Sequence, residues 1–206
     1  NDTFLGLKLD YYINENNILE FTAFDSSSDL DSSKYNYNPE KNERTSYRGD
    51  FTLARGGETY SLKYTSIITD DFTVSAMAGV NKNNSSNLNA GANPLGDTPR
   101  IYERRTGIDL GEWALATPSV QEDERKAYRI DFDWYLNDEH TLRFGVDYED
   151  LKALENTSRA GGVSYRYQDC DTAELAKGNA VDCEFVRVEY YVNAGEFKTE
   201  SSAFYI

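Results

Sequence analysis

The chain has 206 residues, with 36 Asp and Glu against 21 Lys and Arg, a formal net charge of −15 at pH 7. This acidic balance argues against a nucleic-acid partner, because phosphate contacts need clustered Lys and Arg. Hydrophobic residues make up 39 % and aromatic residues 14 % of the chain, and no apolar run reaches the roughly 18 residues of a transmembrane helix. The composition is typical of a polar, tyrosine-rich β-protein.

Apolar and polar residues alternate from the first segment onward. One face of Phe4–Ile13 carries Leu5, Leu7, Leu9, Tyr11 and Ile13. The polar turn Asn14–Asn17 follows, and Ile18–Phe24 then alternates again. Period-2 alternation on both sides of a short polar break predicts two strands joined as a hairpin.

The same unit recurs further along the chain. Two more hairpins are predicted, Thr59–Ile68 with Phe72–Val80 and Ala127–Leu136 with Thr141–Tyr148, around turns at 69–71 and 137–140. Phe197–Ile206 is a last strand, preceded by a strand-like Glu184–Val192 and a turn at 193–196. The three hairpins contribute six strands, and counting Phe197–Ile206 as one more gives seven spans.

The connections alternate in length. Short turns join the strands of a pair, whereas the polar segments 25–58, 81–126 and 150–193 separate the pairs. The short turns should therefore lie at one rim and the long loops at the other. The pattern fits a soluble sandwich or a transmembrane barrel. Strands of about ten residues, aromatic residues near strand ends and the asymmetric connections favour the barrel.

The two faces of the predicted barrel wall have distinct surroundings. We expect lipid contact for the apolar residues Leu7, Leu9, Val74, Ile130 and Phe132. The opposite face, with Arg129, Asp131, Asp133 and Arg143, is expected to line the lumen and to form ion pairs. Bacterial single-chain barrels have an even number of strands, so seven strands predict an arc of a larger wall.

Three stretches carry a resemblance to a known family. The hairpin segments 57–65 and 70–76, the segments 124–131 and 141–147, and the run 202–206 resemble the barrel strands of large, Oar-like TonB-dependent outer-membrane receptors. The resemblance implies a 22-stranded barrel, of which residues 1–206 would form about a third of the wall. It also implies an N-terminal plug domain and a TonB box, neither of which can be located in this chain.

The function that the resemblance implies is uptake of a scarce ligand across the bacterial outer membrane. Its partners would be outer-membrane lipid and lipopolysaccharide, TonB through the N-terminal region, and a small ligand, glycan or peptide. Neither a cofactor nor enzymatic activity is expected. A passive porin-like channel and a secreted β-sandwich that binds carbohydrate or adheres to surfaces remain alternatives.

One predicted outer loop carries residue types suited to ligand recognition. Arg100, Tyr102, Arg104, Arg105 and Trp113 follow a stretch rich in Asn, Ser, Gly and Ala. Tyr, Trp and Arg dominate many binding surfaces. We therefore expect these five residues to contact the ligand. The alternative is that they belong to a mobile outer loop without a binding role.

The cysteines, the single histidine and the acidic clusters are predicted to have structural rather than catalytic roles. Cys170 and Cys183 are the only cysteines, and passage through the oxidising periplasm predicts a disulfide between them. Two cysteines and a distant His140 do not make a zinc site. Asp25, Asp29 and Asp31 depart from the spacing of a calcium loop, which favours a solvated acidic segment. No catalytic group of residues is evident.

Overall fold

The computed structural model describes residues 4–91, 96, 98–104, 106–110, 114–169 and 184–206. These residues form an all-β structure with one short 3₁₀ turn, Ala160–Gly162. Within them, no helix is long and apolar enough to cross a membrane. The strands are β1 (Leu5–Asn14), β2 (Asn17–Asp25), β3 (Ser28–Asn38), β4 (Glu43–Thr69), β5 (Phe72–Asn89), β6 (Arg100–Glu103), β7 (Ile108–Leu110), β8 (Ser119–Asn137), β9 (His140–Ser158), β10 (Ser164–Asp169), β11 (Glu184–Glu189) and β12 (Val192–Tyr205).

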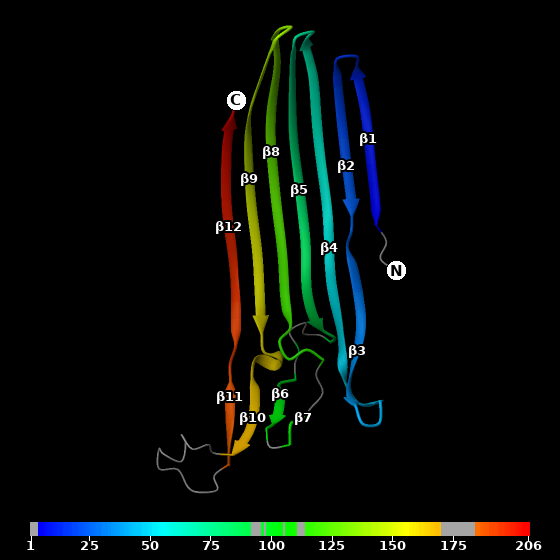
Figure 1. Ribbon diagram of the computed structural model, residues 1–206, viewed down its shortest axis with the longest axis vertical. Coiled ribbons are helices and arrows are strands. Elements are labelled where there is room, and N and C mark those ends of the chain that lie inside the picture. The colour runs from blue at the N-terminus through cyan, green and yellow to red at the C-terminus, as the bar shows by residue number, and fades with distance from the viewer. Residues whose placement is uncertain (1–3, 92–95, 97, 105, 111–113, 170–183) are drawn as a thin grey trace, which may run out of the picture.

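The main sheet is antiparallel, in the order β1-β2-β4-β5-β8-β9-β12, with β3 paired to β4 beyond the end of β2. The all-β, antiparallel part of the expected fold is therefore confirmed, as are seven strands in succession along the sheet. The three predicted hairpins are present, and their short turns lie together at one end of the sheet (Figure 1).

The strands are longer than the alternation predicts. β4 has 27 residues, β5 has 18, and β8 and β9 have 19 each. They run into the segments 25–58, 81–126 and 150–193, which also hold β3, β6, β7, β10 and β11. The expectation of long loops throughout these segments is wrong. One reason is that outer parts such as 81–89 of β5 are polar on both faces, so period-2 alternation disappears there although the ladder continues.

The final strand also differs from the expectation. The predicted turn at 193–196 lies inside β12, where Asn193 to Glu196 pair with Thr157 to Leu154 of β9. Gly195 weakens the strand pattern in the sequence, but its partner Glu155 holds it in the ladder. β12 is therefore a continuous strand of 14 residues.

β4 carries an irregularity where β2 gives way to β3. The Ser26 N–H donates to the Gly57 carbonyl at 2.9 Å, and Gly56 has a positive φ of 80°. A Cβ at Gly57 would lie 1.9 Å from the Lys82 carbonyl oxygen. Only glycine fits so close to a neighbouring backbone, so this pair allows β4 to serve two successive partner strands.

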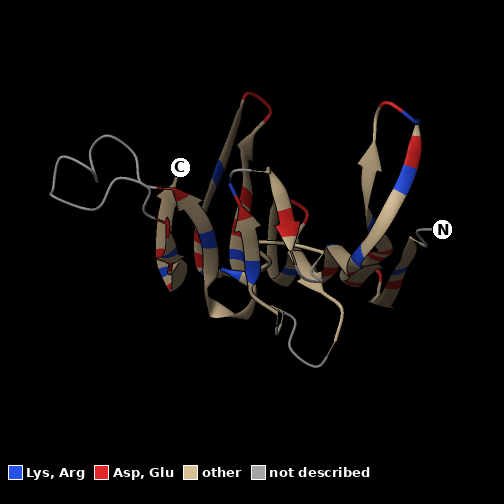
Figure 2. Ribbon diagram, turned by 90° about the horizontal axis from the view of Figure 1, so that it is seen from below, with Lys and Arg blue, Asp and Glu red and all other residues tan. Residues whose placement is uncertain are grey.

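The sheet is a single layer. Among the described residues, the buried hydrophobic side chains are Ala54, Ala114 and Ala160. Leu9, Leu62 and Ile130 are 55 %, 45 % and 45 % exposed. Figure 2, viewed along the strands, shows an open sheet with the N- and C-terminal edges apart. The large hydrophobic residues of the sheet therefore have no second layer over them within the described structure.

A second, smaller sheet lies at the end opposite the short turns (Figure 1). Its order is β11-β10-β6-β7, with β6 parallel to β10 and the other pairs antiparallel. We call it the outer sheet. It follows directly from the β9–β12 pair, because β10 succeeds β9 and β11 precedes β12 in the chain.

Candidate functional site

One face of the main sheet is apolar over its turn-side half. Paired residues in an antiparallel ladder share a face, and the register places Leu9, Phe21, Leu62, Ala78, Tyr128 and Tyr148 in one row. We call this surface the apolar band. It comprises Leu7, Leu9, Tyr11, Leu19, Phe21, Ala23, Tyr60, Leu62, Tyr64, Phe72, Val74, Ala76, Ala78, Val80, Tyr128, Ile130, Phe132, Trp134, Leu142, Phe144, Val146, Tyr148 and Phe204.

The apolar band carries no charged side chain and has a defined height. On β5 it extends from Phe72 to Val80, a length close to the roughly 9–11 residues of a tilted membrane-crossing strand. The expected common face of Leu7, Leu9, Val74, Ile130 and Phe132 is confirmed by the register.

Aromatic rings concentrate near both limits of the apolar band. Near the turns, Phe132 stacks on Phe144 with centroids 4.8 Å apart, and Phe72 meets the Trp134 ring at 6.1 Å. Near the other limit, the Tyr128 and Tyr148 rings lie 6.2 Å apart. Such pairs contribute about 0.5–1.5 kcal/mol each beyond the area they cover, and they tie β5, β8 and β9 together.

The opposite face is polar and cross-linked by ion pairs. Arg129 Nε lies 2.9 Å from Asp131 Oδ1, and Arg143 Nε lies 2.9 Å from Asp133 Oδ1. The Tyr205 hydroxyl of β12 donates to Asp131. The predicted ion pairing of this set is confirmed.

A second group of ion pairs joins the first strands on the same polar face. Lys8 Nζ lies 3.4 Å from Glu20 Oε1, and Lys63 Nζ lies 3.5 Å from Glu20 Oε2. These contacts connect β1, β2 and β4, so both halves of the sheet carry paired charges on this side.

Charged residues replace the apolar ones just beyond the apolar band, on the same face. We call these residues the charged rim; across neighbouring strands they are Asp25, Glu58, Lys82, Glu124, Lys126, Asp150, Lys152, Glu196, Lys198 and Glu200. Lys126 Nζ lies 2.9 Å from Glu124 Oε1. The Lys198 ammonium donates to Glu196 at 2.9 Å and, with Lys152, holds the pKa of the Glu196 carboxyl below its ordinary value of 4.5.

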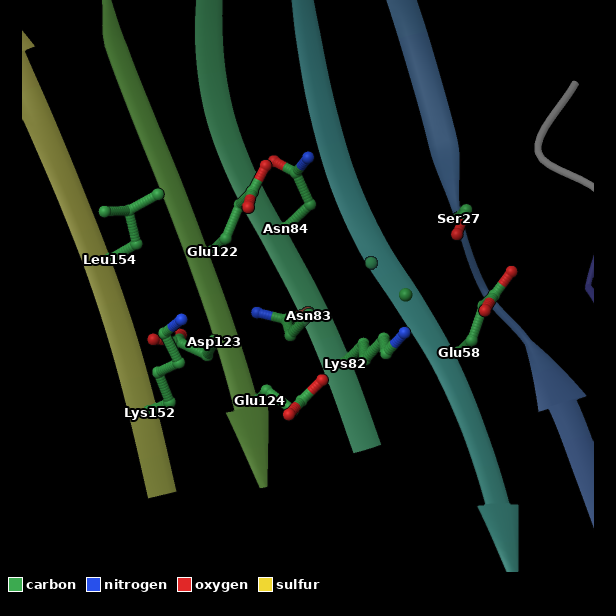
Figure 3. Close-up of a pocket in the computed structure, with 12 residues that line it drawn as sticks. Ser27, Glu58, Lys82, Asn83, Asn84, Glu122, Asp123, Glu124, Lys152 and Leu154 are labelled. Carbon is green, nitrogen blue, oxygen red and sulfur yellow. The ribbon is translucent and has the colours of Figure 1, made fainter. Parts of the chain in front are cut away.

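A groove of about 420 Å³ lies over the charged rim. Figure 3 shows Glu58, Lys82, Glu124 and Lys152 along it, from β4 across β5 and β8 to β9. The alternation of carboxylate and ammonium across the strands makes this groove a strongly polar boundary to the apolar band.

The outer sheet holds two of the predicted ligand-binding residues, and a third, Arg104, directly follows its strand β6. Arg100 and Tyr102 lie on β6, where the Arg100 guanidinium lies 5.1 Å from the Tyr102 ring centroid and its Nε is 2.9 Å from Asp109 Oδ1. The Arg104 backbone N–H donates to the Tyr167 carbonyl at 2.9 Å. The structure therefore brings these residues beside β10.

The neighbouring strands add residues that the sequence reasoning missed. Arg159, Arg166 and Arg187 approach the carboxylate of Glu189 at 3.5, 3.4 and 3.3 Å. We call these four residues the arginine cluster. A signal was present, since alternation within 164–169 and 184–189 places Arg166, Arg187 and Glu189 on one face. The pairing of these two segments was not evident from sequence.

The remaining predicted positions divide into two groups. Arg105, Trp113, Cys170 and Cys183 lie outside the described residues. Within the described residues, no group of three or more His, Cys, Asp or Glu could hold a metal ion. His140 Nδ1 lies 2.9 Å from Asn137 Oδ1 in the β8–β9 turn.

Comparison with known proteins identifies no relative: no protein-family model, curated protein or solved structure matches the chain. The geometry of the apolar band, the charged rim and the arginine cluster therefore carries the functional argument.

Proposed function

We propose that the chain is part of the β-barrel wall of a TonB-dependent receptor in the bacterial outer membrane, which takes up a scarce ligand. The observation that carries the proposal is the apolar band. Its large hydrophobic side chains are exposed or half-buried across the seven strands, and none is fully buried, whereas the largest apolar patch on a typical soluble monomer is about 300–600 Å². Such a surface suits contact with lipid, because transmembrane β-barrels present an outward apolar band about 25 Å tall with aromatic residues at its limits.

The other surfaces agree with this placement. In the proposed wall the ion-paired polar face lines the lumen, and the charged rim lies at the level of the lipid headgroups. Lysine ammonium groups there, such as Lys82 and Lys152, would meet the phosphates of lipopolysaccharide. The outer sheet then lies on the outer side, at the end away from the short periplasmic turns.

The open edges support a larger wall. Among the described residues, β1 pairs only with β2, and β12 only with β9. Backbone groups at a sheet edge need partners in lipid. Further strands would complete the barrel, and the 22-stranded size follows from the family resemblance.

Energy coupling through TonB and a plug domain rests on the same resemblance. A passive channel would share the wall but lack both. A secreted sandwich would require a second sheet over the apolar band, and the outer sheet lies at the end of the main sheet instead (Figure 1).

The test uses the full-length protein expressed in a Gram-negative host. We expect it to sediment with the outer membrane on a density gradient, to require detergent for extraction, and to migrate differently in electrophoresis before and after heating. Cross-linking to TonB in the same cells separates a receptor from a passive channel. Recovery of a monodisperse protein in the aqueous phase without detergent would refute the membrane location.

A further inference from the structure

One face of the outer sheet gathers arginines in an acidic protein, while Glu103, Asp169 and Glu184 of its strands lie on the opposite face. Three arginines surround Glu189, and Arg100 pairs with Asp109 on the adjoining β6–β7 pair. These residues place four guanidinium groups against two carboxylates in a chain whose formal charge is −15. The register puts Arg100, Arg166, Arg187 and Glu189 on the same face of the outer sheet. The excess of positive charge is therefore local and directed to one side.

The arginine cluster borders a hollow on the polar side of the main sheet. Arg159 and Tyr191 line a space of about 430 Å³ together with Ser119, Gln121 and Thr157. Ser119 and Thr157 are paired across β8 and β9, an even number of residues from Arg129 and Asp147 of the polar face. The hollow therefore opens on the polar side of the sheet, away from the apolar band.

Glu189 orients the arginines without using all of their donors. Its Oε1 forms ion pairs with Arg166 and Arg187, and its Oε2 forms one with Arg159. A guanidinium has five N–H donors. The Arg187 side chain is 57 % exposed, and the buried Nε of Arg159 has no hydrogen-bond partner among the described residues. Donors thus remain for another acceptor.

We infer that the arginine cluster binds an oxyanion group of the ligand, a carboxylate or a phosphate. Both groups match the planar fork of arginine. The Tyr191 ring, 5.7 Å from the Arg159 guanidinium, and the hydroxyls of Ser119 and Thr157 would contact the rest of the ligand. The position of this site at the mouth of the lumen rests on the proposed function, whereas its anion chemistry does not.

The test measures binding of citrate, pyrophosphate and uncharged trimethyl citrate to the purified full-length protein by calorimetry. We expect citrate, pyrophosphate or both to bind, trimethyl citrate not to bind, and the affinity to fall as salt is raised. Binding of citrate alone assigns a carboxylate, and binding of pyrophosphate alone assigns a phosphate. Absence of both at millimolar concentration overturns the inference, whatever the variants do.

Two variants locate the binding. Arg187→Gln leaves Glu189 with two arginines and should weaken anion binding roughly tenfold, because a charged hydrogen bond is lost. Arg44→Gln, on the exposed outer part of β4 beside Tyr35, is the matched control and should bind as the native protein does. Equal affinities of the two variants would contradict the site. A protein that lies in the outer membrane but binds neither anion refutes this inference alone, whereas a soluble protein that binds one refutes the proposed function alone.

Discussion

Adjacent residues on one strand have opposite surroundings in this sheet. Ala76 of β5 lies between Tyr64 and Ile130 in the apolar band, whereas Ser75 lies between Thr65 and Asp131 on the polar face. Both side chains are small, so replacing either one by arginine adds a similar volume. The two substitutions therefore differ mainly in the environment that the arginine meets. This pair therefore tests the assignment of the two faces.

Ala76→Arg should destabilise the barrel by about 2–4 kcal/mol, because a guanidinium near the bilayer midplane is costly on the lipid side. Ser75→Arg should change stability far less, since its side chain would enter the lumen beside Asp131. Denaturant unfolding of the full-length protein from lipid vesicles measures both values. Equal losses for the two variants would contradict the assignment of the faces.

The junction of β2, β3 and β4 is the main irregularity at the scale of elements. Gly57→Ala should destabilise by about 1–3 kcal/mol, because its Cβ would lie 1.9 Å from the Lys82 carbonyl oxygen and the backbone would have to move. Gly195→Ala of β12 is the matched control, since its Cβ would meet only the Phe197 ring, at 3.0 Å. Thermal unfolding should rank Gly57→Ala well below Gly195→Ala, and the reverse order would contradict the account of the junction.

The same junction should make stability depend on pH. The Ser27 backbone N–H donates to Asp25 at 2.8 Å and, as the main cause, lowers the pKa of that carboxyl below its ordinary 3.8. A lowered folded-state pKa gives stability that is fully present above about pH 3.8 and is lost as the pH falls through the lowered value.

Asp25→Asn should accordingly lower the unfolding temperature at pH 7, and the difference should shrink toward pH 2.5 as the native carboxyl becomes protonated as well. The comparison of native and variant proteins at the two pH values is the measurement. A difference that is as large at pH 2.5 as at pH 7 would assign the role of Asp25 to its shape rather than to its charge.

Sequence patterns predicted some parts of the strands and missed others. Alternation located the turn-side halves of the hairpins because one face there is apolar, as in Phe72–Val80. The outer halves escaped detection because segments such as Asn81–Asn89 are polar on both faces, and only the pairing of β4 with β5 shows that they are strands. Backbone hydrogen bonds between strands do not depend on side-chain polarity, so such strands leave no alternating pattern in the sequence.

At the scale of the whole molecule, the site was less predictable than the fold. Arg100, Tyr102 and Arg104 could be singled out by residue type alone. The arginine cluster depends on the β10–β11 pairing and on the parallel contact of β6 with β10, which join segments far apart in the sequence. Such nonlocal pairings are set by tertiary geometry, so no local pattern reveals them.

At the scale of the whole molecule, an acidic chain can still present a surface suited to lipid. The charge of −15 is an average over the chain, whereas the apolar band has no charged residue and the polar face and charged rim pair many of theirs. What decides membrane affinity in this account is the arrangement of residues by face, not the mean composition.

The central claim is that the apolar band faces lipid, and spin labels at Leu62 and Ser61 of β4 test it most directly. The full-length protein, labelled at one position at a time and reconstituted in vesicles, is exposed to oxygen, which partitions into lipid, and to a water-soluble nickel chelate. We predict high oxygen and low nickel accessibility at Leu62, and the reverse at Ser61. Equal exposure of both labels to the nickel chelate, or the opposite pattern, would contradict the account.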